Sequence, residues 1–237
     1  MFPIKRKVIK IVRPVVEPLL GIPMPSDGVM GEIEKIYNQV DEMRQILSDR
    51  DITSIRIVVN PEKMVIKESQ RSFTYFNIYD FNVDAIVVNR VIPENVQDVY
   101  FKVWKEIQHK YKEMILDCFA PIPVYYAPLF EKEVVGVEML ERMGSEIFKN
   151  ENPVEIKYNL RTQEVKKEGR EYIFSIYMPF TDKSELSLNQ KGDELIVRTA
   201  NLKRNITLPK TLQSLGIKGA KFEEDTLKIR FGGKENE

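Results

Sequence analysis

The residue types that do most enzyme chemistry are scarce in this chain, which has one cysteine and one histidine among its 237 residues. A phosphate-binding loop of the form GxxxxGK[ST] needs its glycines at that spacing, because backbone amides must close around the phosphates. The eleven glycines never take this spacing. In the nearest approach, Gly232-Gly233-Lys234, Lys228 stands where the first glycine is required. The sequence therefore predicts no phosphate-cradling loop in this chain.

Cys118 and His109 are both predicted to be inert. A single cysteine excludes an internal disulfide framework and a cysteine-rich metal site. Cys118 falls on the apolar face of a helical pattern, where a thiol is usually buried. His109 stands among the charged residues of 105–113, which is typical of a solvated helix surface. Neither residue is expected to act as a nucleophile, a base or a metal ligand.

The charge balance of the chain argues against a nucleic-acid partner. Lys plus Arg and Asp plus Glu number 36 each, whereas nucleic-acid binding usually needs a basic surplus or a basic stripe. A charged fraction of 30% together with one cysteine is typical of an intracellular protein. We therefore expect a cytoplasmic location.

The N-terminal arm, residues 1–23, mixes basic and apolar residues. Its charges interrupt the apolar residues too often for a signal segment or a membrane span, so no integral membrane segment is predicted. An amphipathic helix at the membrane surface is conceivable, which leaves peripheral attachment open. We favour a helix that packs on a missing partner or that lies at a cut end of a longer chain.

Strand and helix patterns alternate three times between residues 54 and 148. The strand candidates are short, β-branched and rich in apolar residues, as expected for parallel strands covered on both faces. Strand–helix alternation builds right-handed βαβ units, so this region predicts half of a doubly wound parallel sheet. A separate helical period precedes it over 27–48. The expected strands are 54–59, 83–88 and 123–127, and the expected helices are 61–79, 94–119 and 134–148.

After Asn152-Pro153 the helical period ends, and stretches of alternating apolar and polar residues follow. Such segments, separated by turn residues, predict a small all-β sandwich. We therefore expect three parts: a basic-apolar arm over 1–23, an α/β domain over 24–150 that lacks the phosphate loop, and a β-sandwich over 152–237. The expected strands of the sandwich are 154–160, 172–178, 185–188, 194–199, 205–208 and 226–231.

A family resemblance is carried by four motifs in unbroken order, VVNPEKMVIKES (58–69), VDAIVVNRV (83–91), FKVWKEIQ (101–108) and APLFEKEVVG (127–136). Over residues 24–148 the chain resembles the C-terminal half of the anion-transporting ATPases, which drive arsenite pumps or target tail-anchored proteins. The sandwich resembles the α-crystallin-like, small heat-shock-like domain appended to some members, with KGDELIVR (191–198) and LPK (208–210) as its clearest marks. The resemblance implies an α/β fold, the C-terminal half of a P-loop-type doubly wound parallel sheet, followed by the small all-β sandwich.

The resemblance also implies an adenine pocket in this half of the fold. Asn89, in VVNR, is the residue to carry over, because its amide offers one acceptor and two donors to the base. It follows a parallel strand, at the edge where doubly wound sheets bind ligands. The apolar loop Pro128-Leu129-Phe130 would cover the flat ring. Without the resemblance, Asn89 is better interpreted as a turn or helix-capping residue. Arg90 and Glu131 are secondary candidates.

The departures from the family pattern concern phosphate, metal and anion chemistry. The phosphate loop and both switch aspartates belong to the family's N-terminal half and are missing here. No catalytic residue is therefore predicted, and ATP with Mg²⁺ is expected only with a P-loop-bearing partner. The zinc-binding cysteine pair of the targeting members would fall at Gln97 and Tyr100, so no zinc is expected. One cysteine cannot build the triad that binds arsenite.

Two functions from different classes follow from these observations. As the adenine-side portion of an ATPase, the chain would be inactive alone and would hydrolyse ATP only when completed by a P-loop-bearing N-terminal half. A homo-oligomer is the other partner considered. As a non-catalytic adaptor, the chain would hold hydrophobic client segments through its sandwich and its arm. The helix over 27–48 would be the last element of the subdomain that lines the client groove in targeting members. A remnant without activity is the third interpretation.

Overall fold

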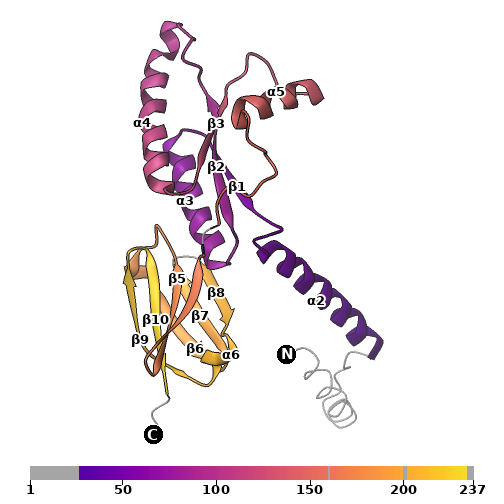
Figure 1. Cartoon of the computed structure of the whole chain (residues 1–237), viewed down its shortest axis with the longest axis vertical. Helices are drawn as coiled ribbons and strands as arrows, with labels where there is room; N and C mark the ends of the chain where they lie inside the picture. Colours follow the sequence, from indigo (N-terminus) through magenta and orange to yellow (C-terminus); the bar gives the residue numbers. More distant parts are fainter. Residues whose placement is uncertain (1–26, 160, 200–201, 234–237) are drawn as a thin grey trace, which may run out of the picture. The chain divides into compact units, whose positions relative to one another are not determined.

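The computed structural model describes residues 27–159, 161–199 and 202–233, and the predicted arm over 1–23 lies outside these ranges. The chain divides into two compact units, residues 1–52 and 53–237. Figure 1 shows the helix of the first unit in indigo and the elements of the second in purple to yellow. The domain boundaries expected near residues 23 and 151 stay predictions.

The described part of the first unit contains one helix, α2 (Asp27–Ser48), as predicted. Its apolar side chains recur at helical spacing, yet most of them are exposed, and Met30 is buried. A single amphipathic helix can bury its apolar stripe only against a second layer. The exposed apolar side chains of α2 are Val29, Ile33, Ile36, Tyr37, Val40, Met43, Ile46 and Leu47.

The second unit begins with the predicted parallel sheet. Its strands pair in parallel in the order β1-β2-β3. Strand β2 is the central one and is buried along most of its length, because both of its edges are paired and both of its faces are covered. The strands are β1 (Ile55–Val59), β2 (Val83–Val91) and β3 (Val124–Pro128).

Three helices accompany the sheet, in the predicted alternation with the strands. Helix α3 (Lys63–Ile78) joins β1 to β2, α4 (Lys102–Phe119) joins β2 to β3, and α5 (Val137–Phe148) follows β3. The core of this region holds buried side chains of α3, such as Ile66 and Phe73, and of α4, such as Ile115, against the apolar residues of the strands. None of the helices within the described residues is both long enough and apolar enough to span a membrane.

The predicted start of the helix at residue 94 is wrong. A 3-10 turn (Val99–Phe101) precedes α4, and the segment before it is a loop. Asp98 caps the turn by accepting from the backbone N–H of Tyr100 at 2.8 Å. The Lys105 ammonium donates to the carbonyls of Glu94 at 2.7 Å and Val96 at 3.1 Å. These bonds tie the loop to the first turn of α4. Apolar residues in this loop continue the helical period by chance, so the pattern overestimates the helix.

The sandwich consists of two antiparallel sheets that enclose a second apolar core, as predicted. One sheet has the order β4-β5-β10-β9 and the other has the order β6-β7-β8. The buried core includes Phe174, Leu195, Leu212, Ile229 and Phe231. The strands are β4 (Gln163–Glu168), β5 (Glu171–Tyr177), β6 (Ser187–Lys191), β7 (Glu194–Thr199), β8 (Leu202–Thr207), β9 (Gly216–Glu223) and β10 (Thr226–Gly232), with a one-turn helix α6 (Lys210–Gln213) and a 3-10 turn (Lys183–Glu185) between them.

The two strands that the sequence does not predict, β4 and β9, both lie at the edges of the larger sheet. Edge strands are often charged, since charges prevent pairing with other chains, and a glycine weakens the strand signal of its segment. β4 reads QEVKKE and β9 contains Gly216 and Gly219, so neither shows a strong apolar alternation. Their pairing with β5 and β10 makes them strands.

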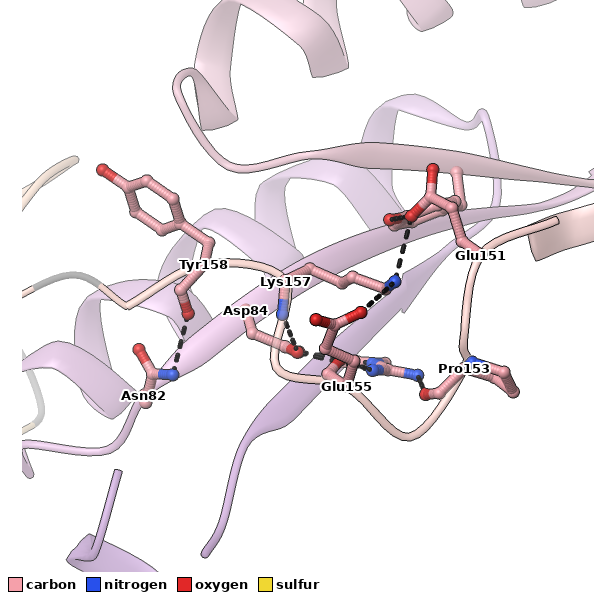
Figure 2. A network of polar contacts seen from close by, with 9 residues as sticks. Asn82, Asp84, Glu151, Pro153, Glu155, Lys157 and Tyr158 are labelled. Carbon is pink, nitrogen blue, oxygen red and sulfur yellow. Dashed lines mark hydrogen bonds and ion pairs between the residues drawn. The ribbon is translucent and has the colours of Figure 1, made fainter. Parts of the chain in front are cut away.

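The strand expected over 154–160 is wrong for 154–159, which forms no strand. Its backbone pairs instead with side chains of β1 and β2 (Figure 2). The Arg56 guanidinium donates to the carbonyls of Pro153 at 2.6 Å and Glu155 at 3.1 Å. The fully buried Asp84 carboxylate accepts from the backbone N–H of Lys157 at 3.0 Å and forms an ion pair with Arg56 at 3.3 Å. These bonds satisfy backbone groups that a strand would otherwise have to pair.

Candidate functional site

The residues predicted to contact a base surround one open hollow at the carboxyl-terminal ends of β2 and β3. The hollow has a volume of about 490 Å³. It brings Asn89 of β2 together with the loop Pro128-Leu129-Phe130, although they lie about forty positions apart in the sequence. The lining residues are Asn89, Arg90, Pro128, Leu129, Phe130, Lys132, Glu133, Val134, Val135 and Met143.

Asn89 lies in a β-bulge rather than beyond the end of its strand. The predicted strand ended at residue 88, but β2 continues to Val91. Val88 pairs with Tyr126 and Val91 pairs with Pro128, so two residues of β2 oppose one residue of β3. Arg90 takes a left-handed backbone conformation with φ 57°, which costs energy for a residue with a side chain. Bulges re-aim side chains and recur next to binding sites.

The chain just past the bulge is fixed by Gln108 of α4. The Gln108 side chain is buried, and its Oε1 accepts from the backbone N–H of Ile92 at 2.7 Å. Its Nε2 donates to the Ile92 carbonyl at 3.3 Å. In addition, the backbone N–H of Leu129 donates to the carbonyl of Val91 at 2.8 Å. The side-chain amide of Gln108 thus binds both backbone groups of Ile92 and forms a clamp on the segment that follows Asn89.

No role for Gln108 is predicted from the sequence, where it stands only within a motif. A signal existed, because a glutamine inside an apolar helical stripe must find polar partners when it is buried. The sequence could not show that those partners are the two backbone groups of a single residue in a loop.

The loop after β3 is tied to α5 by Arg142. Its guanidinium makes a two-pronged ion pair with the Glu131 carboxylate, at 2.5 Å and 3.3 Å. It also lies over the Phe130 ring, 5.1 Å from the ring centroid. The hydrogen bond from Arg142 lowers the pKa of Glu131, and Glu131 in turn raises the pKa of Arg142. Glu131, a secondary candidate for ligand contact, therefore has its carboxylate engaged by Arg142.

The chemistry of the hollow suits the recognition of a flat, partly polar ring. The half-buried Asn89 contributes an amide, and Pro128, Leu129 and Phe130 contribute apolar surface. Arg90 and Lys132 are exposed cations at its margin. The residues present fit the base of a nucleotide. They include no glycine-rich loop that could cradle phosphates.

The other chemically active residues lie elsewhere. His109 is exposed and faces Glu113 at 3.3 Å, on the surface of α4 as predicted. Cys118 is half-buried and accepts a hydrogen bond from the Gln70 amide at 3.0 Å. Across the part of the chain that the structure describes, no three residues of the types His, Cys, Asp and Glu gather as a metal site. The expectation that zinc is not bound stays a prediction.

A parallel sheet whose strands alternate with helices defines an α/β protein, and the hollow lies at the carboxyl ends of its strands, which is where such sheets generally bind ligands. A sequence model of the family described as anion-transporting ATPase matches residues 1–149. The chain therefore belongs to the anion-transporting ATPase family. A second model, of the HSP20-like domain found in ArsA, matches residues 169–231 within the sandwich. The resemblance inferred from the sequence motifs is confirmed.

Individual relatives agree with this assignment. The chain is 39% identical over 233 residues to a putative arsenical pump-driving ATPase 1 of Aquifex aeolicus, covering 97% of this chain and 59% of the relative. It is 31% identical over 227 residues to a putative arsenical pump-driving ATPase of Chlorobaculum tepidum, covering 93% and 56%. The ATPase GET3A of Arabidopsis thaliana is 22% identical over 143 residues, covering 60% and 40%. The chain thus spans less than two thirds of the length of these relatives.

Proposed function

We propose that this chain supplies the adenine-side portion of an anion-transporting-type ATPase. Asn89 hydrogen-bonds the base and the loop 128–130 covers it. ATP hydrolysis, with Mg²⁺ and the phosphates, requires a P-loop-bearing N-terminal portion that completes the site. The single observation that carries this proposal is the hollow of about 490 Å³ in which Asn89 and the apolar loop meet.

Three features of the hollow support base recognition. It lies at the carboxyl end of a parallel sheet, where ligands of doubly wound proteins bind. Its polar group sits on a bulge held by the buried Gln108 clamp, and its apolar cover is tied down by Arg142, so both walls are fixed before a ligand arrives. Preorganised walls reduce the entropy that binding must overcome.

The decisive experiment mixes the chain with a P-loop-bearing N-terminal portion of a family member and measures ATP turnover. We expect no hydrolysis by the chain alone and measurable hydrolysis by the mixture. The Asn89→Ala variant should raise KM for ATP by about tenfold, since it removes hydrogen bonds to the base. Asn189→Ala, an exposed asparagine of the sandwich, is the matched control. A mixture with no gain in turnover would count against the proposal.

A second candidate function is a non-catalytic adaptor that binds hydrophobic client segments. It is favoured by the exposed apolar stripe of α2 and by a second exposed apolar surface at the start of α4. Monomeric proteins rarely expose contiguous apolar surface without a partner for it. The surface at α4 includes Val99, Tyr100, Val103 and Trp104, which are between 51% and 84% exposed.

The adaptor proposal predicts that the chain alone suppresses the aggregation of an unfolded client, with or without ATP. Replacing Val103 and Trp104 by serine should weaken this suppression. Replacing the exposed polar residues Glu106 and Lys110 of the same helix should not. If the chain leaves aggregation unchanged, the adaptor proposal fails while the ATPase proposal stands. We retain a cytoplasmic location for either function, with attachment of the arm at the membrane periphery still open.

A further inference from the structure

The outer face of the larger sheet of the sandwich carries a second hollow, far from the base site in sequence and chemistry. Its volume is about 430 Å³. It extends over three neighbouring strands, β5, β10 and β9, on the face that does not contribute to the apolar core. The lining residues are Glu171, Ile173, Lys218, Gly219, Ala220, Lys221, Glu223, Lys228 and Arg230.

A β-bulge brings an additional lysine to this face. Arg230 pairs with Gly219 and Phe231 pairs with Ile217, so Lys218 is an extra residue in β9. Its side chain lies over the backbone of Gly232, where an added Cβ atom would come within 3.1 Å of the Lys218 Cγ atom. A bulge can re-aim a side chain in this way, and here it adds a cation to the rim of the hollow.

One of the residues that line the hollow is Gly219 of β9. Gly219 faces Arg230 across the strands, and a Cβ atom added at Gly219 would meet no other atom within 4 Å. Its φ lies outside the left-handed region, so backbone conformation does not require glycine there. Glycine inside a strand often marks a place where another molecule approaches closely.

The charges around the hollow are unbalanced in favour of cations. Lys221 and Lys228 face each other directly across β9 and β10, and like charges in this position repel. Glu223 pairs with Lys221, and Glu171 pairs with Arg230 at 3.4 Å. Lys228, on the central strand, makes no ion pair with any of the described residues. Hydrogen bonding to Lys221 lowers the pKa of Glu223, and the nearby Lys228 and Lys183 add to this effect.

We propose that this hollow binds an acidic, extended segment of a partner polypeptide. Carboxylates of the segment would lie between Lys221 and Lys228 and beside Arg230, which removes the repulsion between the two lysines. In an extended peptide, side chains two residues apart are about 7 Å apart along the chain, which matches the spacing of Lys228 and Arg230 on β10. The apolar side chain of Ile173 would contact the uncharged residues between them.

A polypeptide suits the hollow better than a nucleic acid. Glu171 and Glu223 stand at its two sides and would repel an unbroken row of phosphates, whereas a peptide can place uncharged residues opposite them. The chain as a whole has no basic surplus, with 36 basic and 36 acidic residues. The segment expected to bind therefore carries separated carboxylates rather than continuous charge.

The test uses the full chain and a fluorescent eight-residue peptide of alternating Glu and Ala, with peptides of alternating Gln and Ala and of alternating Lys and Ala as probes of charge. Of the three peptides, we expect only the one of alternating Glu and Ala to bind, with an affinity that falls as salt concentration rises. The double variant Lys221→Gln and Lys228→Gln should bind it at least tenfold more weakly. The double variant Lys203→Gln and Lys210→Gln, which removes two exposed charges elsewhere on the sandwich, should bind normally.

A second variant separates a binding role from a structural one. Gly219→Leu should fill the hollow and abolish peptide binding without lowering Tm, because its side chain enters open space. The variant Lys228→Gln should change Tm little, since it removes both the repulsion from Lys221 and the attraction to Glu223, while it weakens binding. Equal loss of binding in the control double variant would overturn the proposal. Binding of inorganic phosphate with no binding of the acidic peptide would overturn the assignment to a polypeptide.

Discussion

The two ends of strand β2 carry polar residues of similar type in opposite settings. At the amino-terminal end, Asp84 is fully buried and paired, and Asn82 is buried with its amide donating to the carbonyl of Tyr158 at 2.9 Å (Figure 2). At the carboxyl-terminal end, Asn89 and Arg90 lie in a bulge that faces an open hollow. Their sequence contexts differ little, since both ends flank the same apolar run.

Structural and functional polar residues on one strand can be distinguished by whether their partners belong to the chain itself. At the amino-terminal end, the partners belong to the chain itself, so the network holds the segment 153–158 against the sheet. At the carboxyl-terminal end, the polar side chains have room for a ligand. We therefore expect changes at the first end to alter stability and changes at the second to alter binding.

The largest effect is expected at the amino-terminal end. Arg56→Ala leaves the buried Asp84 carboxylate without its ion pair, and such changes destabilise a protein by about 3–5 kcal/mol. Urea unfolding would measure the loss. The double variant Arg56→Leu and Asp84→Leu should be less destabilised than Arg56→Ala, because no buried charge remains alone. If Arg56→Ala left the free energy of unfolding unchanged but weakened nucleotide binding, the amino-terminal end of β2 would be functional rather than structural.

The next effect is expected at the Gln108 clamp, which links stability to the site. Gln108→Leu leaves the backbone N–H and carbonyl of Ile92 without their side-chain partner. The expected loss of stability is about 1–3 kcal/mol. In the mixture with a P-loop-bearing N-terminal portion, binding of ATP should weaken as well, because the bulge that carries Asn89 loses its support. Gln97→Leu, at an exposed position of the preceding loop, is the control for both measurements. Loss of stability with unchanged binding would show that the clamp does not position Asn89.

The left-handed conformation of Arg90 predicts a smaller effect, in which a substitution raises the free energy of unfolding relative to its control. Arg90→Gly removes the backbone strain and Arg90→Ala keeps it, while both remove the guanidinium. The glycine variant should be the more stable of the two by up to about 1 kcal/mol, part of which is offset by the greater freedom of glycine in the unfolded chain. Equal stabilities in thermal unfolding would contradict a strained bulge.

The contact between Arg142 and the loop should affect binding alone. Arg142→Gln removes the ion pair with Glu131 and the stacking on Phe130, and these side chains are largely exposed to solvent, so Tm should hardly change. In the mixture with a P-loop-bearing N-terminal portion, affinity for ATP should fall roughly threefold to fivefold, since the apolar cover is less well held. Arg170→Gln, at an exposed position of the sandwich, is the control. A drop in Tm without a change in affinity would place Arg142 among the structural residues.

The smallest effect is expected in the pH dependence of the free energy of unfolding, through the contact between Tyr125 of β3 and Glu151, which follows α5. Burial and a hydrogen bond to Glu151 at 2.7 Å raise the pKa of Tyr125 to about 12. In the unfolded chain the phenol ionises near pH 10. The stabilisation is therefore complete below about pH 10 and is lost as pH rises to about 12. Tyr125→Phe should remove this part of the alkaline decline in stability, and an identical decline in the variant would contradict the assignment.

Much of the α/β region could be predicted from the sequence because its signals are local. The apolar strands and the helical stripes of α3 and α4 lie within single segments, so each element can be located from its own pattern, although the start of α4 could not. The site residues Asn89 and Phe130 could be proposed only through the family resemblance that the motifs carry. Their meeting in one hollow agrees with that hypothesis, and base contact stays a proposal.

What the sequence could not provide are features that depend on a partner far along the chain. β4 and β9 are strands because β5 and β10 pair with them, and the segment 154–159 is not a strand because Arg56 and Asp84 occupy its backbone groups. A polar or glycine-containing segment has no strong preference of its own, so its neighbours decide its conformation.

The sequence by itself determined the alternation of strands and helices, the sandwich that follows and the absence of a phosphate loop from these 237 residues. Each of these is encoded by residue type and period within a short window. Only the tertiary structure decided that Asn89 stands on a bulge, that Gln108 binds the chain beside it and that Lys221 and Lys228 face each other across β9 and β10. The register of paired strands and the aim of buried side chains are set by packing between distant segments, which no local pattern records.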